Sequence, residues 1–133
     1  SNCVKKGFSL VVYDVRQEPI DALVKLGAKS AKTTQEIAKT CSIIVTVLPT
    51  GKEVAEVVMG ADGLFANAKP GTLVMDLSTI DPEPTDKMHA DAKAKGMDAV
   101  DAPIGRLAWH DTTLSNMYWT GGRSSWRRYL TGL

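Results

Sequence analysis

The stretch Val74–Pro84, which reads VMDLSTIDPEP, decides the fold of this chain. Its apolar start predicts a buried strand, and Asp76 is expected where that strand reaches solvent. A polar turn with Ser78 and Thr79 follows, and Pro82 suits the first turn of a helix because its missing N–H would have no partner there. Ligands of open α/β sheets gather outside the carboxyl ends of the strands. Ser78 and Thr79 are therefore candidates for binding an amide or a carboxylate, with a plain turn as the alternative.

The same order of an apolar strand followed by a helix returns along the chain. Strand-like segments lie roughly thirty residues apart, which is the spacing of βαβ units. Their apolar runs are continuous rather than alternating, which is typical of a parallel sheet covered on both faces. The predicted strands are Ser9–Asp14, a minor one at Ala28–Lys32, Ser42–Leu48, Leu73–Asp76 and Met97–Asp101, with Leu114–Thr120 as a further candidate.

Helices are predicted between these strands. Ile20, Leu23 and Val24 fall on one face of a helix that Pro19 opens and Gly27 ends. Two lysines followed by a glycine near the start of the chain resemble the last turn of an earlier helix. The other helix signals are the capping boxes Thr33/Glu36 and Thr50/Glu53, the apolar face of Val54, Val57 and Val58, and the run Pro82–Lys95.

Composition limits the classes of partner. Hydrophobic residues make up 44% of the 133 residues, charged residues make up 23%, and the formal net charge is +1. This balance gives no reason to propose nucleic acid or an anionic membrane as partner. The longest apolar run, Ile43–Leu48, is far too short to span a bilayer. Cys3 and Cys41 lack the spacing of a metal site, so we expect free thiols, no metal and a cytoplasmic protein.

Asp14 ends the first predicted strand. In a dinucleotide-binding domain, an acidic residue at this position bonds the adenosine ribose 2′-OH, and its charge disfavours a 2′-phosphate. This favours NAD as cofactor, with NADP as the second candidate. The alternative is a solvated carboxylate or a helix cap. The glycine-rich motif G-x-G-x-x-G, which would precede such a residue, occurs nowhere in the sequence.

Gly105 and Arg106 follow the last clear strand, Met97–Asp101. A glycine lets a ligand approach the backbone, and the planar fork of an arginine grips a carboxylate, sulfonate or phosphate with two hydrogen bonds. This pair is a candidate for binding the acid group of a substrate. The alternative is a surface arginine that pairs with Asp101 or Asp111.

The other titratable and basic residues give no site. His89 is expected on a solvated helix face without an acidic or nucleophilic partner, and we assign no catalytic residue. Residues 123–133 form an atypical tail, basic with interleaved aromatic side chains. The tail superficially matches sequences that contact nucleic acid, but it is short, so we favour a frayed terminal helix.

Three motifs together resemble the β-hydroxyacid dehydrogenases: Val47-Leu48-Pro49 with Val54, the run Asp76–Pro82, and the run Asp101–Gly105. This family includes 3-hydroxyisobutyrate dehydrogenase and the cofactor domain of 6-phosphogluconate dehydrogenase. The resemblance covers residues 1–122, and the motifs occur in the order and at the spacing of the family. It implies a Rossmann-like, doubly wound parallel sheet that binds NAD or NADP.

The resemblance implies roles for several residues. Asp14 would meet the adenosine ribose, Leu48 and Pro49 would line the cofactor groove, and Ser78 and Thr79 would lie near the nicotinamide and the substrate. Where family members have a serine that holds the substrate carboxylate, this chain has Gly105 followed by Arg106. That Gly-Arg pair is similar to the branch that reduces sulfolactaldehyde or related semialdehydes, in which an arginine meets the acid group.

We therefore expect residues 1–122 to form a partial NAD(P)-binding domain that lacks its first strand and glycine-rich loop. The family's helical domain, which carries its general acid/base lysine, is also expected to be lacking. The family transfers a hydride between nicotinamide and a small β-hydroxy acid or semialdehyde, and this chain alone is expected to be inactive. The rival hypothesis is a non-catalytic, degenerate α/β module that acts through protein association, with a homo-oligomer formed through an exposed sheet edge.

Overall fold

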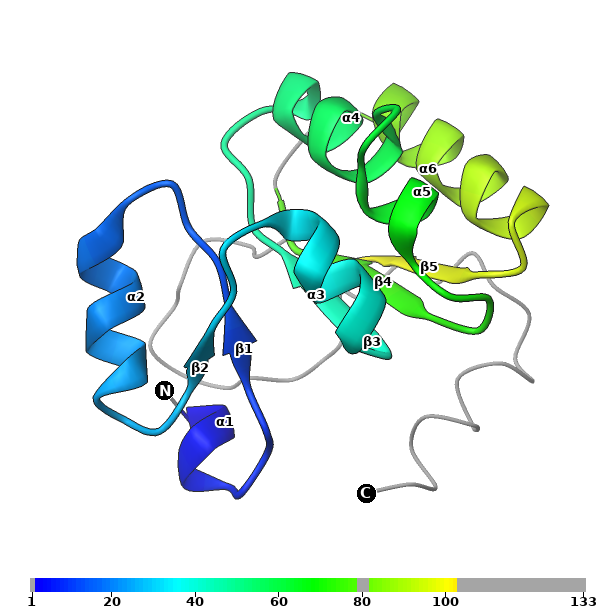
Figure 1. Ribbon diagram of the computed structural model, residues 1–133. Helices are drawn as coiled ribbons and strands as arrows, with labels where there is room; N and C mark the ends of the chain where they lie inside the picture. Colours follow the sequence, from blue (N-terminus) through cyan, green and yellow to red (C-terminus); the bar gives the residue numbers. More distant parts are fainter. Residues whose placement is uncertain (1, 79–81, 103–133) are drawn as a thin grey trace, which may run out of the picture.

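The computed structural model describes residues 2–78 and 82–102, and strands and helices alternate along them (Figure 1). The fold is α/β with parallel strands, as predicted. The predicted strand Leu114–Thr120 and the tail at 123–133 lie outside the described residues. In chain order the elements are α1 (Asn2–Lys5), β1 (Val11–Val12), α2 (Gln17–Val24), β2 (Lys29–Ser30), α3 (Thr34–Thr40), β3 (Ile43–Thr46), α4 (Gly51–Met59), α5 (Leu64–Asn67), β4 (Leu73–Asp76), α6 (Pro82–Ala94) and β5 (Asp98–Asp101).

The strands form two separate parallel sheets. One sheet pairs β1 with β2, and the other has the order β3-β4-β5 with β4 in the centre. A doubly wound sheet has the strand order 3-2-1-4-5-6. The described strands fit this order as positions 3, 2, 4, 5 and 6, so position 1, between β1 and β3, is the one that no described strand fills.

The main core lies between the three-stranded sheet and helices α3, α4, α5 and α6, which gather on one face of it (Figure 1). Val54 and Val58 on α4 have no exposed surface, as their predicted place on the inner face requires. A smaller apolar cluster on the second face contains Leu73, Val100 and Ala102. The buried residues of the main core are Ala38, Ile44, Val54, Val58, Leu64, Phe65, Val74, Met88, Ala92, Met97 and Ala99.

The strands are shorter and less covered than the sequence predicts. Strand Ser9–Asp14 is reduced to β1, because only the two residues of β2 pair with it. In β3, Ile44 and Thr46 are buried, whereas Ile43 and Val45 are 49% and 53% exposed. The prediction that the sheet is covered on both faces is therefore wrong for β3, because no described element packs on its second face.

The signals predicted at the helix ends and on the helix faces are borne out in part. The Thr33 hydroxyl accepts a hydrogen bond from the Glu36 N–H at 3.2 Å and caps α3 as predicted. The Thr50 hydroxyl donates to the Glu53 carboxylate instead of bonding the backbone of α4. On α2 only Ile20 is buried, because that helix covers just the two-stranded sheet.

The structure also bears on the predicted partners. Both cysteines are free thiols, Cys3 exposed and Cys41 partly buried. None of the described helices is long and apolar enough to cross a membrane. Within residues 2–78 and 82–102, no group of three or more histidine, cysteine, aspartate or glutamate side chains could hold a metal ion.

Candidate functional site

A buried hydrogen-bond network around Asp76 joins the carboxyl ends of β3 and β4. Its Oδ1 accepts a hydrogen bond from Thr46 Oγ1 at 2.8 Å and from Ser78 Oγ at 2.6 Å. The backbone N–H of Ser78 donates to the same oxygen at 3.2 Å. Asp76 has no exposed surface, so the prediction that it reaches solvent is wrong. Oδ1 tolerates burial because three donors replace the water that it gives up.

Ser78 connects this network to the loop that begins at Leu48. Ser78 is 2% exposed, and its hydroxyl accepts a hydrogen bond from the Leu48 N–H at 2.9 Å. Both donors of Ser78, its O–H and its N–H, are used by Asp76. A cofactor or substrate carboxylate could be bound by these donors only if one of the bonds to Asp76 were released. Ser78 therefore fixes the predicted cofactor loop at Leu48 and Pro49 from inside the protein.

A row of polar side chains crosses the three-stranded sheet at its carboxyl edge. The register pairs Thr46 with Asp76 and Asp76 with Asp101. Register partners of neighbouring strands point to the same face of a sheet, so the three side chains lie side by side. Asp76 Oδ2 is buried and has no hydrogen-bond partner among the described residues. Burial and the neighbouring Asp76 charge raise the pKa of Asp101, while His89 opposes that shift.

His89 lies above this row on α6 and is half-buried rather than solvated, which corrects the sequence-based prediction. The helix packs on β5 and turns this residue partly toward the sheet. Burial lowers the pKa of His89, and the charges of Asp101 and Asp86 act in the opposite direction. The imidazole is therefore held in its neutral form to a lower pH than an exposed histidine would be.

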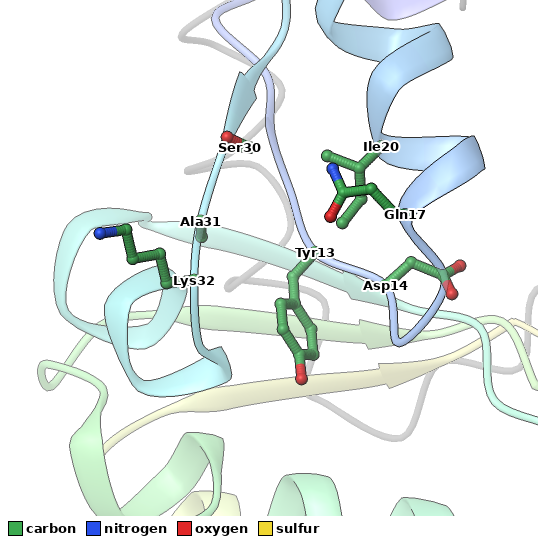
Figure 2. A pocket seen from close by; sticks show the side chains of 7 residues that line it. All are labelled: Tyr13, Asp14, Gln17, Ile20, Ser30, Ala31 and Lys32. Carbon is green, nitrogen blue, oxygen red and sulfur yellow. The ribbon is translucent and has the colours of Figure 1, made fainter.

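Asp14 lines an open pocket of about 340 Å³ at the carboxyl ends of β1 and β2. Figure 2 shows that one wall comes from Tyr13, Asp14 and the first turn of α2, and the other from the end of β2. This is where a doubly wound fold binds the adenosine end of a dinucleotide. The lining residues are Tyr13, Asp14, Gln17, Ile20, Ser30, Ala31 and Lys32.

Arg16 holds the Asp14 carboxylate, a contact that the sequence reasoning missed. The Arg16 N–H donates to Asp14 Oδ1 at 2.9 Å, and Arg16 Nε lies 3.5 Å from the same oxygen. Lys32 is a cationic side chain in the lining of the pocket, whereas Arg16 contacts Asp14 without lining the pocket. The sequence could have indicated these contacts, because Arg16 and Lys32 each lie within two positions of the end of a predicted strand.

The structure brings some of the predicted site residues together and leaves others undescribed. Leu48 and Ser78 are in direct contact, and Pro49 follows on the exposed surface. Asp14 lies apart from them, in the pocket of the other sheet. The remaining predicted site residues, Thr79, Gly105 and Arg106, lie outside the described residues, as does the predicted domain boundary at 122.

The sequence of this chain is similar to those of known dehydrogenases and reductases. Residues 1–129 match the family described as the NAD-binding domain of 6-phosphogluconate dehydrogenase. The chain is 38% identical over 122 residues to 3-sulfolactaldehyde reductase of Escherichia coli strain K12, covering 92% of this chain and 41% of the reductase. It is also 36% identical over 104 residues to the NAD-dependent L-serine dehydrogenase of Pseudomonas aeruginosa, covering 78% of this chain and 35% of that enzyme.

Solved structures agree with these sequence relatives. The 3-hydroxyisobutyrate dehydrogenase of Mycobacterium tuberculosis, solved with L-serine, superposes with a TM-score of 0.77 at 25% identity. That match covers 96% of this chain and 43% of the dehydrogenase. The chain thus spans less than half the length of these relatives. The predicted resemblance is confirmed: this chain belongs to the family of NAD-binding domains represented by 6-phosphogluconate dehydrogenase, and 3-hydroxyisobutyrate dehydrogenases are among its relatives.

Proposed function

We propose that this chain is part of the cofactor-binding half of an NAD(P)-dependent oxidoreductase acting on a small β-hydroxy acid or semialdehyde. The observation that carries the proposal is the pocket at the carboxyl ends of β1 and β2, with Asp14 on its wall. A carboxylate there accepts hydrogen bonds from the ribose hydroxyls of the adenosine. The free thiols at Cys3 and Cys41 are consistent with a cytoplasmic protein.

The residues of the chain would hold and orient the two reactants. Asp14 would take the ribose, while Leu48 and Pro49 would line the groove toward the nicotinamide, with Thr79 nearby. Gly105 and Arg106 would take the acid group of the substrate, which a guanidinium can bind with two parallel hydrogen bonds. The nicotinamide itself supplies the hydride chemistry when it is bound.

The fit of a dinucleotide to the chain is partial. The pocket around Asp14 suits an adenosine ribose, but the sequence contains no G-x-G-x-x-G loop to hold the pyrophosphate. No lysine matches the family's general acid/base motif. We therefore propose that the chain by itself binds the cofactor weakly and does not turn over substrate.

Calorimetric titration with NADH and, in parallel, NADPH tests the binding proposal. We expect NADH to bind more tightly, because the Asp14 carboxylate repels a 2′-phosphate even though Arg16 offsets part of its charge. Asp14→Ala should reduce this preference. Asp62→Ala is the matched control, since Asp62 is exposed and does not line the pocket. Equal affinity for the two nucleotides, or no effect of Asp14→Ala, would contradict the proposed role.

A second candidate function, association with another copy of the chain, is favoured by the uncovered face of β3. Ile43, Val45 and Val47 are 49%, 53% and 64% exposed and follow one another along that face. An uncovered apolar strand at a sheet edge invites pairing with another chain. Light scattering over a range of concentrations tests this, and we expect Val45→Lys to shift the distribution toward monomer. A wild-type chain that stays monomeric throughout would rule this function out.

A further inference from the structure

The buried Asp76 carboxylate satisfies only one of its two oxygens. Oδ1 accepts hydrogen bonds from Thr46 Oγ1, Ser78 Oγ and the Ser78 N–H, while Oδ2 is buried without a partner in the part of the chain that the structure describes. An ionised carboxylate oxygen accepts hydrogen bonds only, so Oδ2 needs a donor. Buried polar atoms in native proteins are nearly always bonded, and an exception calls for an explanation.

Asp101 is the side chain placed to supply that donor. It is the register partner of Asp76 on the neighbouring strand, and both side chains point to the face covered by α6. Neighbouring strands lie about 4.8 Å apart, so the two side chains are adjacent and a change of rotamer can bring the carboxyl groups into hydrogen-bond contact. Two ionised carboxylates at this spacing would repel each other, whereas one proton between them removes the repulsion and satisfies Oδ2.

We propose that Asp101 carries a proton and donates it in a hydrogen bond to Oδ2 of Asp76, so that the two carboxyl groups share one proton. The bond extends the row that begins with Thr46 on β3 across to β5. Each of the three strand ends is then joined to its neighbour by a side chain as well as by the backbone.

The charges around the pair are consistent with this proton. Burial and the charge of Asp76 raise the pKa of Asp101, so it keeps its proton at a pH where an exposed aspartate has lost it. From α6, His89 and Asp86 are the titratable groups that face this region, and burial lowers the pKa of His89. The His89 charge acts against the proton on Asp101, but burial and the Asp76 charge outweigh it, since the net shift of the Asp101 pKa is upward. From β3 the facing group is Thr46, which does not titrate.

The shared proton would make Asp76 and Asp101 positioning residues for the proposed site. The Ala102 N–H, just beyond Asp101, donates to the Asp76 carbonyl oxygen at 2.9 Å. The side-chain bond would add a second link at the same point, directly before the segment that contains Gly105 and Arg106. This consequence rests on the proposed function, whereas the proton itself does not.

Carbon-13 NMR titration of the aspartate carboxyl groups, without nucleotide, tests the proposal. We expect the Asp101 midpoint to lie above that of an exposed aspartate and to fall in Asp76→Asn, which removes the facing charge. Asp62→Asn is the matched control: it removes an exposed charge of the same sign and should leave the Asp101 midpoint unchanged, because Asp62 contributes to neither the Asp101 nor the His89 shift. An Asp101 midpoint that stays the same or rises in folded Asp76→Asn would overturn the proposal.

A second pair of variants keeps the test decisive if Asp76→Asn does not fold. In Asp101→Asn, the side-chain amide N–H can donate to Oδ2 of Asp76 at every pH, as protonated Asp101 does. In Asp101→Ala there is no donor. We expect Asp101→Asn to gain stability relative to wild type as the pH rises through the Asp101 midpoint, and Asp101→Ala to be the less stable variant throughout. Equal stability of the two variants at every pH would contradict the shared proton.

These measurements separate the shared proton from the proposed function. The NMR titration and the stability measurements are both made on the chain without nucleotide, so they test the shared proton even if the chain does not bind NADH. Conversely, if Asp101 titrates like an exposed aspartate while the chain prefers NADH, only the positioning proposal is lost.

Discussion

Ser78→Ala is the substitution that most directly tests the buried network at the candidate site. The change removes the hydroxyl that donates to Asp76 Oδ1 at 2.6 Å and accepts from the Leu48 N–H at 2.9 Å. Asp76 keeps its bonds from Thr46 and from the Ser78 N–H. The Leu48 N–H loses its hydrogen-bond partner in a partly buried position.

The cost follows from these two bonds. A hydrogen bond to a charged group contributes about 1.5–3 kcal/mol to stability, and a neutral one contributes about 0.5–1.5 kcal/mol. Ser78→Ala removes one of each kind at a residue that is 2% exposed, so little water can enter to replace them. We therefore expect the free energy of unfolding to fall by about 2–4 kcal/mol.

Urea unfolding of the two proteins measures this difference, and the slope m should stay the same, because the surface exposed on unfolding hardly changes. Ser42→Ala is the matched control, since Ser42 is exposed and, within the described residues, bonds through its backbone carbonyl and not through its hydroxyl. The control should change stability by less than about 0.5 kcal/mol. If Ser78→Ala costs no more than the control, the network does not hold the Leu48 loop.

Two further predictions concern the core and the response to pH. Val54 has no exposed surface, so Val54→Ala should lower the free energy of unfolding, measured with urea, by about 2–3 kcal/mol. Val47 is 64% exposed, so Val47→Ala should lower it far less. Similar losses in the two variants would contradict the assigned core. Burial lowers the pKa of His89 in the folded protein, so folding favours the neutral imidazole. The contribution of His89 to stability is therefore present above its ordinary pKa of 6.5 and is lost as the pH falls through the folded pKa. His89→Gln should therefore lose less stability than the wild type as the pH falls below 6.5. An unchanged dependence of stability on pH would refute the burial of a neutral His89.

The alternation of strands and helices was predictable because its signals are local. The end of α1 before Gly7, the Thr33 cap of α3 and the apolar run of β4 each depend on residues within a few positions of one another. The family resemblance was readable for a similar reason, since its motifs are short runs at the strand ends.

The burial of Asp76 could not be predicted in this way. Its partner Thr46 lies 30 positions away, and only the register of β3 with β4 brings the two together. The exposure of β3 was missed because a run of apolar residues does not show what covers each face. The pairing of Arg16 with Asp14 depends on how the chain turns after β1, which apolar periodicity does not report.

Because the two sheets are separate, the smaller sheet can open locally while the larger one stays folded. β1 and β2 pair over two residues, while β3, β4 and β5 pair over four at each interface. Amide protons of β1 and β2 should therefore exchange with solvent through local opening, and those of β4 only through global unfolding. The Asp14 pocket belongs to the part that opens first. A nucleotide that binds there would slow amide exchange chiefly in β1 and β2, because it would stabilise the closed form of that part.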